Sequence, residues 1–319
     1  MADNTRKRPA ASGIFAALTP QTRHWSEAAQ PARLGLMSDV AELPSALYEP
    51  VVRAALAEDL GRAGDVTAAL VPAAARLRVE VRARGAGVIA GLGPARLAAA
   101  LVDPAITWET VAADGTLVAR GQTVVRLDGS ARSVLTAERT MLNFIGRLSG
   151  VATLTAAYVA AVAGTRARIA ATRKTTPGLR ALEKHAVRLG GGWPHRYGLD
   201  DAILIKDNHV AAFGGSVRAA VAAARAAAGH LTPIEVEIDR LDQLEDALVA
   251  GPQVVMLDNF ALADLAEAVR RNAGRAVLEA SGGVTLETVG AIAATGVDVI
   301  SVGALTHSAP NFDVGLDAV

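Results

Sequence analysis

Residues 171–209 read ATRKTTPGLRALEKHAVRLGGGWPHRYGLDDAILIKDNH, and they link two short apolar runs that both end in charge. The first run, RIAATRK, ends at Arg173 and Lys174, and the second, AILIKDN, reaches Lys206 and Asp207. Each run has the length and composition of a buried β-strand. In α/β barrels and open α/β sheets the chemistry lies where strands end, so we expect these charges to line a site.

Basic residues are concentrated in this part of the chain. Residues 165–209 contain nine Lys or Arg and four Asp or Glu, whereas the whole chain contains 32 of each kind. A formal net charge of zero argues against a general binder of nucleic acid or of membrane surfaces. We therefore expect a local site for an anionic ligand.

Composition bounds the class of protein. The 319 residues are 51% hydrophobic and 20% charged, which is typical of globular proteins and leaves room for two domains or one barrel with additions. The absence of cysteine excludes disulfides, zinc–thiolate sites and thiol nucleophiles. There is no long uncharged apolar run and no secretory signal pattern. We expect a cytoplasmic protein that binds neither membranes nor nucleic acid.

The first half of the chain predicts a tail and a small domain. Residues 1–45 lack sustained periodicity and are expected to form a flexible tail, with Met37 as a candidate alternative start. A helical pattern then ends at Leu60, before Gly61. Alternating runs with one helical interruption follow, and residues 46–149 are therefore expected to form an α+β sandwich domain.

An amphipathic helix is expected at the end of this domain, over residues 130–150. Its sequence is SARSVLTAERTMLNFIGRLSG, with Leu and Ile at helical spacing. Three arginines, Arg132, Arg139 and Arg147, fall on or near its other faces.

Beyond Gly150 the pattern changes to strands alternating with Ala-rich helices. The expected strands are residues 168–172, 202–206, 234–239, 254–258, 276–279 and 298–302. Repeated βα units imply parallel strands with right-handed crossovers, and their regular spacing favours a barrel over a doubly wound sheet. We expect the barrel domain to occupy residues 150–304.

Polar residues follow four of these strands and glycines follow two others. The polar ends are Arg173-Lys174, Lys206-Asp207-Asn208, Glu237-Ile238-Asp239 and Asp258-Asn259, and the glycine turns are Ser281–Gly283 and Val302–Ala304. Glycine turns at this position commonly hold a phosphate through backbone N–H groups. Carboxylates beside a phosphate favour a bridging metal, so we expect Mg²⁺ at Glu237 and Asp258. The expected substrate is a magnesium-bound phosphorylated compound, with a second anion held by the arginines.

Several blocks resemble the quinolinate phosphoribosyltransferase (nicotinate-nucleotide pyrophosphorylase) family in order and spacing. They are ERTMLNFIGRLSGVAT, TRKTTPGLRALEKHAVRLGGG, HRYGLDDAILIKDNH, EVEID, MLDNF, EASGG and ISVGALTHSAP. The likeness runs from about residue 47 to residue 313. It implies an open, incomplete α/β barrel plus an amino-terminal sandwich domain, with residues 305–319 packing back on the first domain.

The resemblance also implies an activity and an assembly. The family converts quinolinate and phosphoribosyl pyrophosphate into nicotinate mononucleotide, pyrophosphate and CO₂ in NAD synthesis, with Mg²⁺ as cofactor. Its members form homodimers or assemblies of dimers in which each site borrows residues from its neighbour. By this resemblance, Arg139 enters the site of the partner subunit.

Roles for the remaining residues follow from the same motifs. The resemblance implies that the dicarboxylate is surrounded by Arg173, Lys174, His195 and Arg196, and that Thr172 also binds substrate. It implies that Lys206 reaches phosphoribosyl oxygens or a carboxylate, while Glu237 and Asp258 face the ribose hydroxyls and the metal. The turns containing Ser281, Gly282, Gly283, Val302, Gly303 and Ala304 would hold the 5′-phosphate. The catalytic set is Lys174, Lys206, Glu237 and Asp258.

Some residues keep a plainer interpretation beside the functional one. The helical run with Arg180, Lys184, His185 and Arg188 is more typical of a solvated or interface face than of ligands. Trp193 is either a core anchor or a stacking platform, and His209 and His307 are either buried or catalytic. Glu237 is favoured over Glu235, on the same strand face, because it is nearer the strand end. Pro194 stands where the family usually has Asn, which affects the placement of His195.

Three alternatives remain open at this point. The first is a barrel aldolase or lyase in which Lys206 forms a Schiff base. The second is a paralogue of the same fold that uses a different aromatic acid. The third is a binding protein without catalysis. The opposed charges argue against it, and they are those of Arg139, Arg173, Lys174, Glu237 and Asp258.

Overall fold

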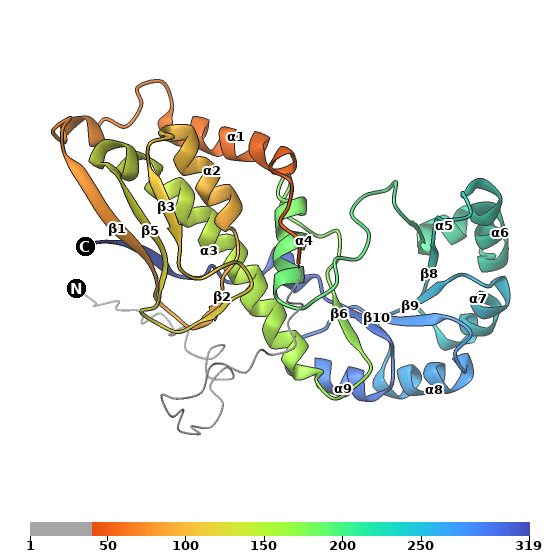
Figure 1. Ribbon diagram of the computed structural model, residues 1–319. Helices are drawn as coiled ribbons and strands as arrows, with labels where there is room; N and C mark the ends of the chain where they lie inside the picture. The colour runs from red at the N-terminus through yellow and green to blue at the C-terminus, as the bar shows by residue number, and fades with distance from the viewer. Residues whose placement is uncertain (1–39) are drawn as a thin grey trace, which may run out of the picture. The chain divides into compact units, whose positions relative to one another are not determined.

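The computed structural model describes residues 40–319, coloured from red to blue in Figure 1. The expectations for the tail, including Met37, therefore concern residues outside the described part, apart from its last positions. The described chain contains a four-stranded antiparallel sheet and a six-stranded parallel sheet, together with a two-stranded ribbon.

The amino-terminal part is built on the antiparallel sheet, in the order β12-β1-β5-β3. Its elements are α1 (Glu49–Leu60), β1 (Arg76–Ala83), β2 (Gly87–Val88), α2 (Leu92–Val102), β3 (Thr107–Thr110), β4 (Leu117–Val118) and β5 (Thr123–Ser130). The short strands β2 and β4 pair separately. Alternation along β1 places Val79 and Val81 in the core, because successive side chains of a strand face opposite sides.

The helix α3 (Ala131–Ala161) is longer than the sequence predicts, since it continues for eleven residues beyond Gly150. It packs against α2 and β5 of the first sheet and against α4 (Arg180–Leu189) and β6 (Arg168–Ala170) beyond it. The sequence places a domain boundary inside this helix, and Figure 1 shows α3 running from beside α2 towards the parallel strands.

By length and composition α3 is apolar enough to cross a membrane, and it is the one helix of residues 40–319 that passes this test. However, 56% of its apolar window is buried, and side chains such as Met141, Ile145 and Val151 lie in the protein core. Such burial is typical of a core helix.

The parallel sheet has the order β6-β11-β10-β9-β8-β7. Its remaining strands are β7 (Ile203–Ile205), β8 (Ile234–Ile238), β9 (Val254–Asp258), β10 (Val277–Ser281) and β11 (Val299–Ser301). Between them run α5 (Asp207–Ala212), α6 (Val217–Ala227), α7 (Leu244–Ala250), α8 (Leu262–Asn272) and α9 (Val289–Ala294). All six expected strands are confirmed within two residues at each end. The edge strands β6 and β7 do not pair, so within residues 40–319 the barrel stays open, as predicted.

The carboxyl end of the chain returns to the first sheet. After α10 (Ala304–His307), the last strand β12 (Val314–Ala318) pairs antiparallel with β1, and Val81 lies opposite Leu316. The connecting segment crosses α3 closely: a Cβ on Gly150 would lie 2.1 Å from Pro310 O. The two glycines of α3, Gly146 and Gly150, thus leave room for this segment.

Candidate active site

Strand register places the acidic residues of β8, β9 and β10 on one face of the parallel sheet. Glu237 lies opposite Met256, which lies opposite Glu279, and Asp258 lies opposite Ser281. Residues two apart on a strand share a face, so Glu235 belongs to the same face. The opposite face is apolar and buried, with Val236, Ile238, Val255, Leu257, Leu278 and Ile300. The polar face is therefore the candidate site.

Lys206 and Glu237 are in contact on this face, as neighbouring strand ends. The Nζ atom of Lys206 donates to Oε2 of Glu237 at 2.7 Å. Lys206 is about half exposed, and Glu237 is mostly buried. Lys206 also begins α5, where its backbone N–H donates to Nδ1 of His209 at 2.9 Å. The neighbouring ends of β7 and β8 thus bring a cation and a carboxylate together next to solvent.

His195 lies between two buried carboxylates. Its Nε2 atom is 3.2 Å from Glu235 Oε2 and 3.5 Å from Glu279 Oε1. Burial alone would lower the pKa of His195, but its hydrogen bonds and charge interactions with Glu235 and Glu279 raise that pKa to about 9. Its Nδ1 atom accepts from the Arg196 N–H at 2.8 Å, a contact that the doubly protonated ring must give up.

The same three side chains form a group that could hold a metal ion. The ligand atoms of His195, Glu235 and Glu279 all lie within 4.8 Å of one another. Neither of the predicted magnesium residues, Glu237 and Asp258, belongs to this group. Burial raises the pKa of Glu235, the hydrogen bond from His195 opposes this shift, and the negative charge of Glu279 adds to it.

Arg173 and Arg196 add positive charge beside this cluster. Burial and the positive charge of Arg173 lower the pKa of Arg196, and the Nε atoms of both side chains are buried without a hydrogen-bond partner. Arg196 Nη1 donates to Ala202 O at 3.1 Å. Buried donors without partners are costly, so these guanidinium groups are suited to an anionic ligand.

Lys174 extends from the next position towards the glycine turn after β11. A Cβ on Gly303 would lie 3.2 Å from Lys174 Cδ, which shows how closely the lysine passes. The backbone of Lys174 is held at both ends, because its N–H donates to Thr172 Oγ1 at 3.0 Å and its carbonyl accepts from Thr306 Oγ1 at 2.8 Å. Val302 is buried, and its N–H donates to Ala170 O.

The turn after β10 requires glycine. Gly282 and Gly283 have φ angles of +91° and +59°, and a Cβ on Gly282 would lie 2.1 Å from Asn259 Oδ1. Asn259 itself has a φ of +57° and donates from Nδ2 to Asp258 Oδ2 at 2.8 Å. Asp258 is therefore oriented by the residue that follows it.

Arg139 is separate from these residues within the chain. It is exposed on α3, and among residues 40–319 no hydrogen bond or ion pair joins it to a residue at the strand ends. The structure brings Lys206 to Glu237, and His195 and Arg196 to Glu235, but it does not bring Arg139 to this face.

Comparison with known proteins identifies the family. Residues 65–149 match the model for the quinolinate phosphoribosyl transferase N-terminal domain, and residues 151–317 match the model for its C-terminal domain. The chain belongs to the quinolinate phosphoribosyltransferase family.

Curated relatives in this family are similar over most of their length. The nicotinate-nucleotide pyrophosphorylase [carboxylating] of Mycobacterium leprae is 48% identical over 272 residues, which cover 83% of this chain and 95% of the relative. The quinolinate phosphoribosyltransferase [decarboxylating] 1b of Nicotiana tabacum is 40% identical over 284 residues, which cover 83% of this chain and 81% of the relative.

Solved structures of the family share the fold. The NadC crystal structure from Streptococcus pyogenes superposes with a TM-score of 0.83 at 40% identity, covering 88% of this chain and 99% of that one. The nicotinate-nucleotide pyrophosphorylase of Francisella tularensis gives the same TM-score at 37% identity, and the match covers 88% of this chain and 99% of that one. The predicted fold class, an open α/β barrel with an amino-terminal sandwich domain, is confirmed.

The structure corrects the expected solvated face and decides between other interpretations of individual residues. Lys184 and His185 are buried in α4 and do not form a solvated face. Trp193 is 41% exposed and so is not a core anchor, although the Arg168 guanidinium lies 4.3 Å from its ring. His209 and His307 are exposed.

Sequence reasoning also missed two buried carboxylates. Glu279 lies in the EASGG block and Glu183 in the helical run, and neither was predicted to be buried. Both are almost completely buried in the structure. The sequence alone does not show which basic side chain contacts a given carboxylate when the two lie on different elements of the fold. Alternation along EVEID is the sequence signal that places Glu235 on the same strand face as Glu237.

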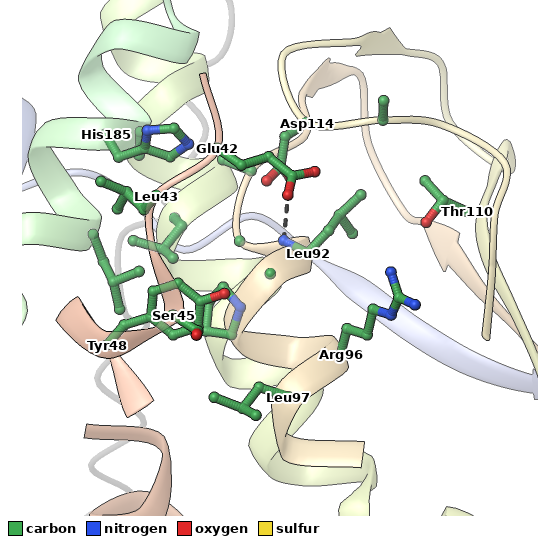
Figure 2. Close-up of a pocket in the computed structure, with 18 of the residues that line it drawn as sticks. Glu42, Leu43, Ser45, Tyr48, Leu92, Arg96, Leu97, Thr110, Asp114 and His185 are labelled. Atoms are coloured by element: carbon green, nitrogen blue, oxygen red, sulfur yellow. Dashed lines mark hydrogen bonds between the residues drawn. The ribbon is translucent and has the colours of Figure 1, made fainter. Parts of the chain in front are cut away.

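A cavity of about 340 Å³ lies outside this site, between the loop before α1, α2 and α4 (Figure 2). Glu42, Tyr48, Asp114 and His185 line it, with Arg96 at its side. Burial raises the pKa of Asp114 to about 7. None of the predicted site residues lines this cavity.

Proposed function

We propose that this chain transfers the phosphoribosyl group of phosphoribosyl pyrophosphate to quinolinate, releasing pyrophosphate and CO₂ and supplying nicotinate mononucleotide for NAD synthesis. Family membership over residues 65–317 supports this reaction. The observation that carries it in the structure is the meeting of cations and carboxylates at the strand ends, with Lys206 Nζ 2.7 Å from Glu237 Oε2. A dianionic ring acid and an activated sugar phosphate need both kinds of charge in one place.

The dicarboxylate is assigned to the cationic part of the site. Arg173 and Arg196 have buried donors without partners, and planar guanidinium groups suit planar carboxylates. His195, with its raised pKa, adds a third donor, and Lys174 adds a fourth beside Thr172. Several oriented cations are required because two carboxylates on one ring repel each other.

The transfer step is assigned to Glu237 and Asp258. When the ring nitrogen displaces pyrophosphate, positive charge develops at the anomeric carbon, and nearby carboxylates stabilise it. Both residues also supply the oxygen donors that Mg²⁺ prefers, and they share one face of the sheet. This donor set fits a magnesium ion bound largely through the substrate. When bound, the ion would offset the charge of the leaving pyrophosphate.

Loss of CO₂ follows from the first step. Once the ring nitrogen carries the ribose, the positively charged ring accepts the electron pair of the bond to the adjacent carboxylate. CO₂ leaves and a proton takes its place at the ring carbon. The remaining carboxylate stays paired with the cations, and so the product is held while the bond breaks.

The 5′-phosphate is assigned to the two glycine turns. The first turn begins at Ser281, the last residue of β10, and continues with Gly282 and Gly283. The second turn, Val302–Ala304, follows β11, the strand paired with β10. Positive φ angles at Gly282 and Gly283 permit the close backbone approach that a phosphate requires. Lys174, against Gly303, supplies a nearby positive charge.

The direct test is an assay for release of both pyrophosphate and CO₂. Wild-type protein is incubated with phosphoribosyl pyrophosphate, Mg²⁺ and either quinolinate or nicotinate. We expect equal amounts of both products with quinolinate. Turnover of nicotinate without CO₂ would instead support a paralogue specific for another aromatic acid, and absence of both products would contradict the proposed reaction.

Arg139 and the assembly need a separate experiment. We propose a cytoplasmic homodimer, or an assembly of dimers, in which Arg139 of each subunit completes the neighbouring site. The exposed position of Arg139 on α3 supports this role. Arg139→Ala and Lys174→Ala are each expected to be inactive, whereas mixed dimers combine one intact half-site from each. Recovery of activity after subunit exchange is the expected result, and continued inactivity counts against a shared site.

A further inference from the structure

Helix α4 carries two charged residues that are completely buried at adjacent positions. Glu183 and Lys184 both have 0% of their surface exposed. Burying a charged side chain is strongly unfavourable unless other groups satisfy it. Adjacent helical residues point about 100° apart. The two side chains therefore require separate partners, and these partners lie in two different loops.

Glu183 holds the loop that follows β6. Its Oε2 atom accepts from the Thr176 N–H at 3.0 Å, and its Oε1 atom accepts from Thr176 Oγ1 at 2.8 Å. The loop between β6 and α4 contains Arg173 and Lys174, so Glu183 fixes its backbone two residues beyond the predicted site lysine.

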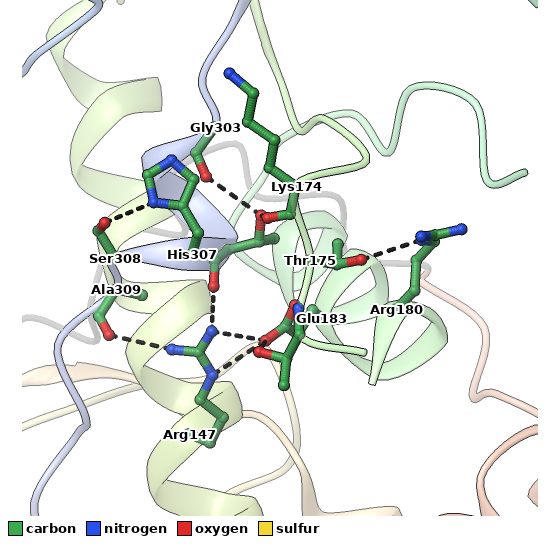
Figure 3. Close-up of polar contacts among 11 residues, drawn as sticks. Arg147, Lys174, Thr175, Arg180, Glu183, Gly303, His307, Ser308 and Ala309 are labelled. Atoms are coloured by element: carbon green, nitrogen blue, oxygen red, sulfur yellow. Dashed lines mark hydrogen bonds and ion pairs between the residues drawn. The ribbon is translucent and has the colours of Figure 1, made fainter. Parts of the chain in front are cut away.

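Arg147 completes this attachment from α3. Its Nε and Nη2 atoms donate to Glu183 Oε1 at 3.1 Å and 2.6 Å. It also donates to the carbonyls of Ala309 and Thr306, and Figure 3 shows the guanidinium between Glu183 and Ala309. Thr306 in turn donates from Oγ1 to Lys174 O. The loop carrying Lys174 is therefore bound to α3, α4 and α10 at once.

Lys184 holds the second loop, between α4 and β7. Its Nζ atom donates to the carbonyls of Pro194 and Arg196, the latter at 2.8 Å, and lies 5.3 Å from the centre of the Tyr197 ring. These two carbonyls flank His195, whose φ of +51° is unusual for a residue other than glycine. Lys184 thus holds both sides of the strained residue. Pro194, which lacks an N–H, still supplies its carbonyl.

We propose that Glu183 and Lys184 are positioning residues that hold Arg173–Lys174 and His195–Arg196 at a fixed mutual distance for the dicarboxylate. The inference rests on the proposed function, because it assumes that these four residues bind quinolinate. A residue that positions cations contributes to binding without touching the ligand, since a displacement of about 1 Å can cost on the order of 100-fold in rate.

The first test is Lys184→Met, which keeps the volume and removes the donor. We expect the KM for quinolinate to rise about 10-fold or more, while the KM for phosphoribosyl pyrophosphate changes less than about 3-fold. The matched control is Arg225→Met, which likewise removes a cation donating to a backbone carbonyl, that of Gly251, between α6 and α7. Wild-type constants in the control and unchanged constants in Lys184→Met would overturn the proposal.

The second test is Glu183→Gln. Its matched control is Glu80→Gln, because Glu80 is also buried and also contacts arginine and threonine side chains, but in the first sheet. A raised KM for quinolinate is expected in Glu183→Gln alone. Equal effects in both variants would mean that loss of a buried carboxylate acts through general stability, and the proposal would then be wrong.

Restoring an ammonium group at position 184 separates the effect of its hydrogen bonds from the effect of side-chain volume. The chain has no cysteine, so Lys184→Cys can be alkylated specifically in denaturant and refolded. Bromoethylamine creates a lysine analogue, and bromopropane creates its neutral counterpart. The expected result is a normal KM for quinolinate with the analogue and a raised KM with the neutral form. Equal constants in the two forms would contradict the proposal.

Failure to fold is also informative. If Lys184→Met and the bromopropane product both fail to fold while the lysine analogue folds, Lys184 is a requirement of the fold, and the positioning role is overturned. Wild-type turnover of quinolinate is measured in every series. Its absence would refute the proposed function, whereas wild-type turnover with unaffected variants would refute only the role of α4.

Discussion

His195 Nε2 lies 3.2 Å from Glu235 Oε2, and the backbone of His195 has a φ of +51°. A left-handed backbone outside glycine costs about 1 to 3 kcal/mol, so surrounding contacts must hold it. The carboxylates outweigh the effect of burial and raise the pKa of His195 from 6.5 to about 9. The resulting stabilisation is fully present below pH 6.5 and is lost as the pH rises through about 9.

Glu235→Gln should therefore change the pH dependence of quinolinate binding. Without this carboxylate the pKa of His195 falls, and the ring becomes neutral at a lower pH. We expect the KM for quinolinate to match the wild type near pH 6, to exceed it about 2-fold near pH 8 and to exceed it about 5-fold near pH 9, if the pKa of His195 falls by about one unit from about 9. Steady-state kinetics across this pH range check the result. Parallel pH profiles in the two proteins would disprove the role of Glu235.

Lys206 and Glu237 are expected to act as a unit. Their contact at 2.7 Å is half exposed on the lysine side, so its contribution to stability should be about 0.2 to 1 kcal/mol. In kcat, however, Lys206→Met and Glu237→Gln should each cause a large loss, and the double variant should lose little more than the worse single one. Additive losses in kcat would show that the two residues serve independent steps.

The parallel strands could be predicted because each short apolar run ended in a polar pair or a glycine turn. Lys206 and Glu237 illustrate this: adjacency of parallel strands was enough to bring two strand ends together. The burial of Lys184 could not be predicted, since a lysine among Arg180, His185 and Arg188 has the pattern of a solvated helix. The partners of Lys184 are backbone carbonyls, and a pattern of side chains does not indicate which carbonyls accept hydrogen bonds. The length of α3 was missed because glycine at position 150 resembles a helix end, although here it serves a close crossing.

Gly150→Ala tests that crossing. The added Cβ would lie 2.1 Å from Pro310 O, a backbone atom that cannot rotate away. We expect a loss of about 1 to 3 kcal/mol in the free energy of unfolding, as is typical when a core is overpacked or the backbone must shift. Gly290→Ala on α9 is the matched control, because its nearest contact is an ordinary 3.5 Å and alanine favours a helix. Equal stability of the two variants in denaturant unfolding would rule out a tight crossing.

Asp114→Asn should stabilise the protein in alkaline solution. Asp114 Oδ1 accepts from the Leu92 N–H at 3.2 Å, at the start of α2, and lies near Glu42 (Figure 2). Burial raises its pKa from 3.8 to about 7, with a further increase from the charge of Glu42 and opposition from backbone N–H groups. The stabilising contribution of this group is present below pH 3.8 and is lost as the pH rises through about 7.

Asparagine keeps the acceptor for Leu92 and cannot ionise. We therefore expect the stability of Asp114→Asn relative to the wild type to be greater near pH 8.5 than near pH 5, by about 1 to 2 kcal/mol after allowance for solvent screening. Asp103→Asn provides a control of opposite sign, because the Ala105 N–H and Ser133 lower the pKa of Asp103 and its charged form is the favoured one. This control should lose stability near neutral pH. Urea unfolding of both variants at the two pH values decides the matter: a wild-type pH dependence in Asp114→Asn would mean that Asp114 is ionised freely in the fold.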